Sequence, residues 1–419
     1  MKVMKSILSK VLLSLILSII SGSTVFSQLY EWRGPGRTGI YNETGLLKKW
    51  PDGGPKLLWE AMDLGDGYSA VTVTDDAVYI TGRKETSDVL TALTLEGKKK
   101  WETVYGKAWM TNHTGSRSIP TYYNGNIFLV SGSGDIVCVG SDGKVKWSKN
   151  HYTLYESKPL MFGISESPLV VDNMVIASPG GKKASVVAFN INDGKVIWEA
   201  EPIESEPQYV NPQLIGHGGK KMLVTVMGQY AFAIDVKTGK ILWRVDYAAA
   251  NAATGRVMKN HAITPQYRDG SILIANGYNW VALKLKLSAD GNSVQTVWEN
   301  RNFDPQHGGV VLLGNNIYGA NHQSAPVDAW ICVDWNTGKT LWTQKWFTRG
   351  SIISADGMLY LFEEKSGHVA LVKPGSEKLD IVSEFQITKG EGPFWAHPVI
   401  SKGRLYIRHG NVLMVYQIK

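Results

Sequence analysis

Three of the nine histidines in this chain, His261, His307 and His397, occupy equivalent places, each just before an apolar segment that ends in a turn sequence. A histidine side chain titrates near neutral pH and therefore suits general acid–base catalysis or metal ligation. None of the three has the short-range spacing of metal-binding histidine motifs, so the sequence predicts no metal site. His261, His307 and Tyr68 are the candidate catalytic residues.

Two arginines, one carboxylate and several other polar or aromatic side chains occupy similar places. Arg117 and Arg349 could bind a carboxylate, sulfate or phosphate group with paired hydrogen bonds. Tyr68 and Trp395 offer flat faces to a sugar or an aromatic ring. The candidate ligand-binding residues are Arg117, Glu166, Asn211, His322, Arg349, Trp395 and His397. The wall of a water-filled channel would use the same residue types, so both interpretations stay open.

The elements that must position these residues are repeats marked by a recurring tryptophan. Seven tryptophans follow one another at steps of 42 to 55 residues: Trp59, Trp101, Trp147, Trp198, Trp243, Trp298 and Trp342. Five of them come shortly after a Gly-Lys pair. A period of about 40–50 residues with a turn before each aromatic residue is typical of β-propeller blades. Eight inner-hairpin turns predict eight blades of four antiparallel strands.

A propeller brings the chain to every inner strand from the same face. Residues just before those strands should therefore converge on one funnel, and His322 should join them from a loop inside its blade. The last repeat has only three strands before Lys419, while Pro55–Glu60 resembles an outer strand. We therefore predict an all-β, eight-bladed propeller, a single domain over residues 28–419, closed by an N-terminal strand that completes the last blade. Closure removes free sheet edges.

The first 27 residues have a different composition from the rest. Three lysines precede an apolar run at 11–20, and small residues follow it, as in a secretory signal peptide. We expect cleavage between Ser27 and Gln28, a periplasmic or secreted protein, and no transmembrane segment in the mature chain, because the apolar run is too short to span a bilayer. Losing three lysines and no acidic residue lowers the net charge from +7 to +4. The basic residues are scattered, which argues against a nucleic-acid partner.

The repeats also carry a family resemblance. Ala233, Asp235, Thr238, Gly239 and Trp243 follow the pattern Ala-x-Asp-x-x-Thr-Gly-x-x-x-Trp. This pattern resembles the tryptophan-docking repeat of the pyrroloquinoline quinone (PQQ)-like propellers, which include quinoprotein alcohol dehydrogenases and the outer-membrane assembly factor BamB. The lead segment 32–39 is similar to that of many secreted bacterial PQQ-like repeat proteins. The resemblance implies the fold and a packing role for tryptophan between blades, and it is weak evidence for activity.

The resemblance also implies what a cofactor site would need. A PQQ site with calcium uses an arginine for the quinone carboxylates, a glutamate and an asparagine for the metal, and an aspartate as base. Arg117, Glu166 and Asn211 resemble part of that set, but His261 stands where the aspartate is wanted. The chain also lacks the two adjacent cysteines typical of quinoprotein dehydrogenases. These departures argue against bound PQQ.

Three functions remain open from the sequence. The leading hypothesis is an exported propeller that binds a small-molecule or saccharide ligand, or an envelope protein partner, at its funnel face. The first alternative is an enzyme acting on an anionic saccharide, as a lyase or hydrolase. The second is a PQQ-dependent dehydrogenase. Whether the protein is catalytic at all is not decided by these residues.

Overall fold

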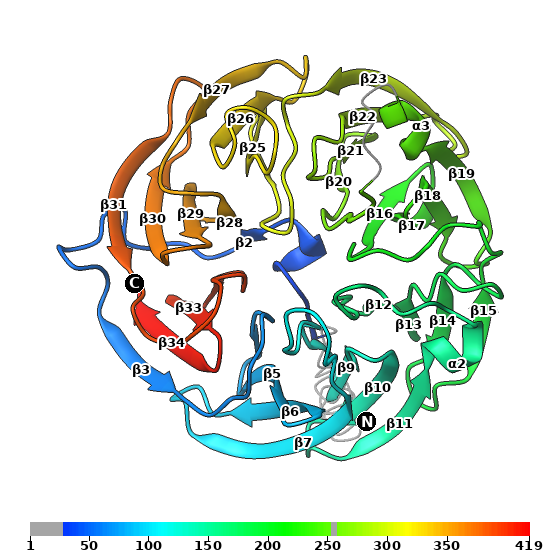
Figure 1. Ribbon diagram of the computed structural model, residues 1–419, viewed down its shortest axis with the longest axis horizontal. Helices are drawn as coiled ribbons and strands as arrows, with labels where there is room; N and C mark the ends of the chain where they lie inside the picture. The colour runs from blue at the N-terminus through cyan, green and yellow to red at the C-terminus, as the bar shows by residue number, and fades with distance from the viewer. Residues whose placement is uncertain (1–27, 253–257) are drawn as a thin grey trace, which may run out of the picture.

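The computed structural model describes residues 28–252 and 258–419. The expected signal peptide, residues 1–27, lies outside the described residues. Six of the eight sheets have four strands and two gain a fifth from the N-terminal segment, and the eight blades of four strands surround a central axis (Figure 1). Within each of them, neighbouring strands are antiparallel, as in the pairing of β17 (Lys220–Val226) with β18 (Tyr230–Asp235). The predicted eight-bladed all-β propeller is therefore confirmed.

Each blade runs from an inner strand at the axis to an outer strand at the rim of the ring (Figure 1). Blades 1 to 4 contain β4 (Thr72–Val73), β5 (Val78–Lys84), β6 (Ser87–Leu93) and β7 (Lys99–Lys107); β8 (Thr121–Tyr123), β9 (Asn126–Val130), β10 (Asp135–Gly140) and β11 (Val145–Asn150); β12 (Leu169–Val171), β13 (Met174–Ala177), β14 (Val187–Asn190) and β15 (Val196–Glu199); and β16 (Gln213–His217), β17, β18 and β19 (Ile241–Asp246). Blades 5 to 8 contain β20 (Gln266–Arg268), β21 (Ser271–Ile274), β22 (Ala282–Leu287) and β23 (Val294–Asn300); β24 (Val311–Leu313), β25 (Asn316–Ala320), β26 (Trp330–Asp334) and β27 (Thr340–Gln344); β28 (Gly350–Ala355), β29 (Met358–Glu363), β30 (His368–Lys373) and β31 (Asp380–Gln386); and β32 (Val399–Ser401), β33 (Arg404–His409), β34 (Val412–Gln417) and β3 (Leu57–Ala61). Short helices α2 (His151–Tyr155) and α3 (Tyr247–Asn251) follow β11 and β19.

The hydrophobic core lies between blades rather than in one centre. Each of eight clusters of buried apolar residues joins two neighbouring blades, and the last joins blade 8 to blade 1. A blade alone would leave both faces of its sheet uncovered, so each repeat depends on its neighbours for burial. The described residues include no helix that is both long and apolar enough to cross a membrane.

The recurring tryptophan docks each blade onto the next. The indole Nε1 of Trp198 donates to Val236 O at 2.9 Å, in the outer turn of the next blade. Gly239, with φ +73°, lies against the same indole, and a Cβ there would be 2.7 Å from it. Equivalent bonds of 2.9–3.1 Å join Trp59 to Leu95, Trp101 to Ser141, Trp147 to Ile191, Trp298 to Trp335, and Trp342 to Gly375. The packing role that the resemblance implies is present.

Trp243 departs from this pattern. Its indole N–H has no hydrogen-bond partner among the described residues. The outer turn of the next blade is different, because Gly291 faces the side chain of Met222 instead of an indole. At the join between blades 7 and 8, Phe385 takes the tryptophan's place, and Gly54 lies against its ring.

The N-terminal strand closes the ring as predicted. Strand β3 pairs antiparallel with β34, the last strand of the chain, and Trp59 lies opposite Val415. Two shorter N-terminal strands join other blades: β1 (Leu29–Tyr30) pairs antiparallel with β8, and β2 (Ile40–Tyr41) pairs parallel with β28. The N-terminal residues therefore contact blades 2, 7 and 8.

Between β1 and β2 the chain crosses the central axis (Figure 1). The 3-10 helix η1 (Pro35–Arg37) lies there, and its Arg37 donates to Pro168 O at 2.8 Å and Pro212 O at 3.0 Å and pairs with Glu31 at 3.0 Å. Arg33 donates to Ile352 O at 2.9 Å and also bonds Val310 O. Both arginines are buried. The N-terminal segment therefore occupies the central channel at this level, and the channel is not open to water throughout its length.

Candidate functional site

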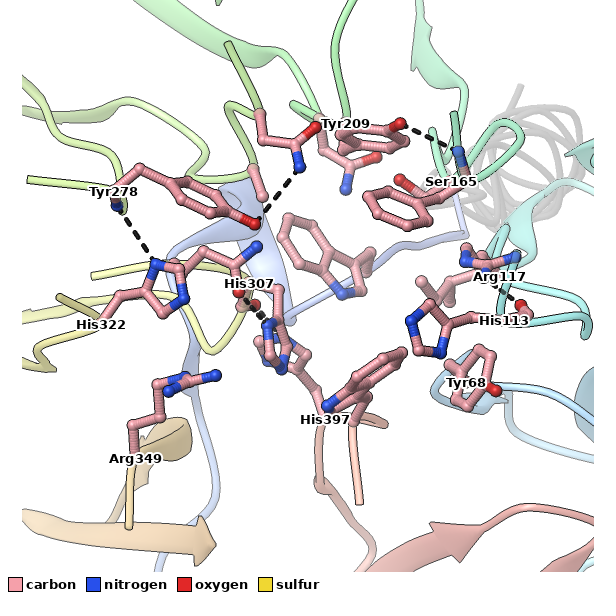
Figure 2. A pocket seen from close by; sticks show the side chains of 18 residues that line it. Tyr68, His113, Arg117, Ser165, Tyr209, Tyr278, His307, His322, Arg349 and His397 are labelled. Atoms are coloured by element: carbon pink, nitrogen blue, oxygen red, sulfur yellow. Dashed lines mark hydrogen bonds between the residues drawn. The ribbon is translucent and has the colours of Figure 1, made fainter. Parts of the chain in front are cut away.

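A cavity of about 290 Å³ lies on the axis beside this N-terminal segment. Most of its wall comes from linkers that join the outer strand of one blade to the inner strand of the next (Figure 2). Eight of the ten predicted site residues line it: Tyr68, Arg117, Asn211, His307, His322, Arg349, Trp395 and His397. Glu166 and His261 are not among the lining residues.

Aromatic rings form much of the cavity wall. Tyr68 and Trp395 pack with ring centroids 5.0 Å apart, and His113 packs on Trp395 at 4.9 Å. The ring of Phe162 continues this series, 5.7 Å from His113 and 5.9 Å from Tyr209. These surfaces suit the flat or apolar part of a ligand.

Ten of the eighteen lining residues were not among the predicted site residues, and Trp32, His113 and Phe162 show best what the sequence argument missed. His113 and Phe162 each stand four residues before a predicted site residue, Arg117 and Glu166, and so lie further from the inner strands than the predicted positions. Trp32 belongs to no blade. The tight Gly-Pro-Gly sequence after Arg33 was the available signal, because no repeat needs a turn there.

Arg117 brings a positive charge to one side of the cavity. Its Nη1 donates to Gly115 O at 2.9 Å, its Nη2 bonds His113 O, and its guanidinium lies 5.1 Å from the centre of the Tyr68 ring. Burial lowers its pKa. No ion pair joins Arg117 to a carboxylate within the described part of the chain. The backbone thus fixes the guanidinium and leaves its charge available to an anion.

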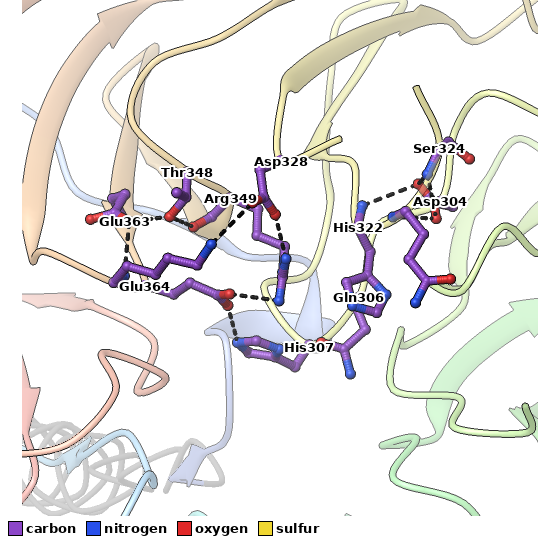
Figure 3. Close-up of polar contacts among 12 residues, drawn as sticks. Asp304, Gln306, His307, His322, Ser324, Asp328, Thr348, Arg349, Glu363 and Glu364 are labelled. Atoms are coloured by element: carbon purple, nitrogen blue, oxygen red, sulfur yellow. Dashed lines mark hydrogen bonds and ion pairs between the residues drawn. The ribbon is translucent and has the colours of Figure 1, made fainter. Parts of the chain in front are cut away.

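Arg349 lies on another side and belongs to a network of charges (Figure 3). Its Nη2 is 2.7 Å from Glu364 Oε1, and its Nη1 pairs with Asp328. The other oxygen of Glu364 is 3.2 Å from His307 Nε2, while His307 Nδ1 contacts Gln306 Oε1. Glu364 is buried. His307 Nε2 thus faces a carboxylate oxygen that has no hydrogen-bond partner among the described residues, and the Gln306 contact at Nδ1 orients the ring beside Arg349.

His397 and His322 line the cavity as neutral side chains. A guanidinium only donates, so the Nδ1 of His397 accepts from Arg33 at 3.0 Å, and its Nε2 donates to His307 O at 2.8 Å. Burial and the nearby Arg33 charge hold the pKa of His397 well below its usual range. His322 Nδ1 accepts from the N–H of Tyr278 at 3.2 Å, and burial lowers its pKa to about 4. His397 thereby anchors the N-terminal segment.

The structure places His261 and Glu166 behind the cavity wall. The His261 ring packs edge-on against Trp280 at 4.5 Å, and burial lowers its pKa to about 4. Both carboxylate oxygens of Glu166 accept hydrogen bonds of 2.9 Å from Ser178, and burial raises its pKa to about 7. The three histidines thus do not meet, since only His307 and His397 are in contact.

The cavity does not fit calcium with PQQ. Calcium takes several oxygen ligands, usually including carboxylates. No carboxylate lines the cavity. Two buried carboxylates lie behind the lining residues. Glu166 accepts hydrogen bonds from Ser178, and Glu364 pairs with Arg349 and lies 3.2 Å from His307. The described residues contain no group of three or more His, Cys, Asp or Glu side chains that could hold a metal ion. No reaction step through a quinone follows from this donor set.

Comparison with known proteins places the fold. A family model described as outer membrane protein assembly factor BamB matches residues 36–151 and 106–344. The chain is similar to BamB from Moraxella catarrhalis, with TM-score 0.61, 14% identity, and 87% of this chain and 99% of that chain covered. It is also similar to a europium-containing methanol dehydrogenase (TM-score 0.53, 13% identity, 90% and 88% covered) and to the computationally designed Ika8 protein (0.57, 8%, 87% and 100%). No curated protein matches.

Proposed function

Since this chain belongs to the family of the outer membrane protein assembly factor BamB, we propose that it acts as an exported binding protein whose ligand or partner engages the central cavity. Family membership supports a binding or scaffold role of the kind that assembly factors perform. The cavity supplies the place for it. The bound group should carry a carboxylate, sulfate or phosphate on a flat or apolar body.

The observation that carries this proposal is the charge of the cavity. Arg117 and Arg349 line it, and no carboxylate does. Arg349 is already paired with Glu364 and Asp328, so among the described lining residues Arg117 is the arginine without an ion pair. An anionic group bound there would lie beside aromatic rings in a partly dry environment, where a charged hydrogen bond is stronger than in water. The volume suits one side chain or a small molecule rather than a folded domain.

The contacts of the histidine rings fit a binding role better than a catalytic one. A general base needs a nitrogen free to reach a substrate proton. Both nitrogens of His397 are hydrogen-bonded to groups of the protein, whereas His307 Nδ1 contacts Gln306 and its Nε2 lies 3.2 Å from Glu364 without a hydrogen bond. One observation favours the saccharide enzyme as a second candidate, namely the buried Glu364 beside His307 at 3.2 Å. Release of unsaturated product or reducing ends from a uronate polysaccharide, lost in His307→Gln, would establish that activity.

Export and domain organisation belong to the same proposal. We assign residues 1–27 to a signal peptide and residues 28–419 to one propeller domain in the periplasm or outside the cell. N-terminal sequencing of the protein recovered from the periplasmic fraction should begin at Gln28. Retention of residues 1–27 in the cytoplasmic fraction would contradict this assignment.

The binding proposal is tested with two simple anions, phthalate as an aromatic carboxylate and glucuronate as a saccharide carboxylate. Calorimetric titration should show binding of at least one. Arg117→Met should weaken it at least tenfold, since about 1.4 kcal/mol corresponds to a factor of ten and charged hydrogen bonds contribute about 1.5–3 kcal/mol. Arg244→Met, at an exposed arginine on β19 that lies over Tyr230, is the matched control and should not change the affinity. Absence of binding to both anions, or equal affinity in Arg117→Met, would refute the proposal.

A further inference from the structure

Exposed methionines gather on one face of the propeller. Four of the methionines in the described residues are exposed, Met62 (64%), Met110 (47%), Met161 (60%) and Met258 (54%). All four lie in linkers between an outer strand and the next inner strand. The five buried methionines lie in strands or directly after one: Met174, Met222, Met227, Met358 and Met414. Core packing accounts for the buried set and leaves the exposed set unexplained.

The linkers that carry the exposed methionines also carry lining residues of the cavity, so the methionines lie on the same face of the propeller as the cavity. Met161 immediately precedes Phe162, and Met258 stands two residues before Asn260. Neighbouring linkers touch, since the side-chain amide of Asn112 donates to Met161 O at 3.3 Å. Met110 stands two residues before this Asn112.

One aromatic residue extends the set to the far side of the cavity. Phe347 is 48% exposed, has φ +48°, and stands two residues before Arg349. A bulky residue rarely adopts that backbone conformation, and here one face of the ring stacks on His368 with centroids 3.6 Å apart while the other part of the ring stays exposed. We call Met62, Met110, Met161, Met258 and Phe347 the methionine rim.

We propose that the methionine rim docks an extended segment of a partner polypeptide, with apolar side chains on the rim and an acidic side chain in the cavity. This inference rests on the proposed function and names the partner class of the same site. Methionine is unbranched and polarisable, so a surface rich in it adapts to many apolar sequences. The rim occupies linkers of five different blade junctions, which only a ligand longer than the cavity can cover. The positive charge of Arg117, which has no ion pair among the described residues, favours an acidic residue of the partner in the cavity.

A polypeptide explains these features better than a membrane surface. The arginines line the cavity, and the side chain of Arg349 is only 21% exposed. A flat layer of anionic headgroups resting on the rim would not reach them, whereas a chain that inserts one side chain would. A small molecule held in the cavity would leave the methionines in water.

The test measures binding of a short fluorescein-labelled peptide in which phenylalanine alternates with glutamate, by fluorescence anisotropy. In the rim variant, Met62, Met110, Met161 and Met258 are all changed to serine. The matched control changes four exposed apolar residues of outer strands to serine: Val145, Val196, Ile197 and Leu341. We expect the rim variant to weaken peptide binding at least tenfold, and the control variant to bind as the unchanged protein does.

Footprinting gives a second measurement on the unchanged protein. Hydrogen peroxide oxidises exposed methionines, and the peptide should slow oxidation of the four rim methionines. Undiminished peptide affinity in the rim variant, no peptide binding by the unchanged protein, or rim-dependent sedimentation with phosphatidylglycerol vesicles instead of peptide binding would each overturn this inference. Phthalate or glucuronate binding that still depends on Arg117 in any of these cases would show that the proposed function stands without it.

Discussion

Replacing Gly239 by alanine tests how blades are docked, because a second glycine provides a matched control. Gly239 and Gly219 have almost the same backbone conformation, φ +73° and +75°. Alanine at either site incurs the left-handed penalty of about 1–2 kcal/mol, and both gain similarly from a less flexible unfolded chain. A Cβ at Gly219 would meet nothing within 4 Å, whereas at Gly239 it would be 2.7 Å from Trp198. The difference between the variants therefore isolates the indole contact.

The size of that difference follows from what Trp198 must give up. The indole is buried and hydrogen-bonded to Val236 O at 2.9 Å. Moving it loses a bond of about 1 kcal/mol net and adds an overpacking cost of about 1–3 kcal/mol. Gly239→Ala should therefore lower the free energy of unfolding by about 3 kcal/mol more than Gly219→Ala. Urea unfolding followed by tryptophan fluorescence measures both. Free energies of unfolding that agree to within about 0.5 kcal/mol would refute the docking argument.

Three further outcomes follow from buried groups. Trp198→Phe should cost about 1 kcal/mol more than Trp243→Phe in urea unfolding, since only the first indole N–H has a partner; equal costs would remove the hydrogen bond's role. The folded protein binds the Glu166 proton more tightly than the unfolded chain, because burial raises the pKa to about 7 from the ordinary 4.5, so stability should fall as pH rises from about 4.5 to 7. Glu166→Gln should remove a fall on the order of 3 kcal/mol, and an unchanged urea–pH profile would contradict this. Arg33→Met should lower the free energy of unfolding by about 3 kcal/mol or more, because it leaves buried carbonyls unpaired. A loss below about 0.5 kcal/mol, as at a surface site, would contradict this.

The propeller could be predicted because its information is local and repeated. Five of the seven recurring tryptophans stand four residues after a turn glycine, so the register of one blade predicts the others. The N-terminal segment in the channel has no such repeat. Its contacts join residues far apart in the chain, as in the bond from Arg33 to Ile352 O, and a single sequence gives no sign of them.

The site residues show the limit of a register argument. His261 was predicted to reach the funnel, but its neighbour Asn260 lines the cavity instead. The same holds for Ser165 and Glu166. Successive side chains of an extended chain point to opposite sides, so a position that is right to within one residue can still assign the wrong side chain to the cavity.

The N-terminal segment has a consequence for the order in which the protein folds. Residues 29–61 precede every complete blade in the chain, yet β2 pairs with β28, β3 pairs with β34, and Arg33 donates to Ile352 O. Blades 1 to 6 can stack on their neighbours as they are made, but this segment must wait for almost the whole chain. Contacts of such large sequence separation form late and slowly. The amide protons of β3 should therefore gain protection from exchange together with those of β34, and the unfinished ring stays a pliable, open arc until both ends of the chain are present.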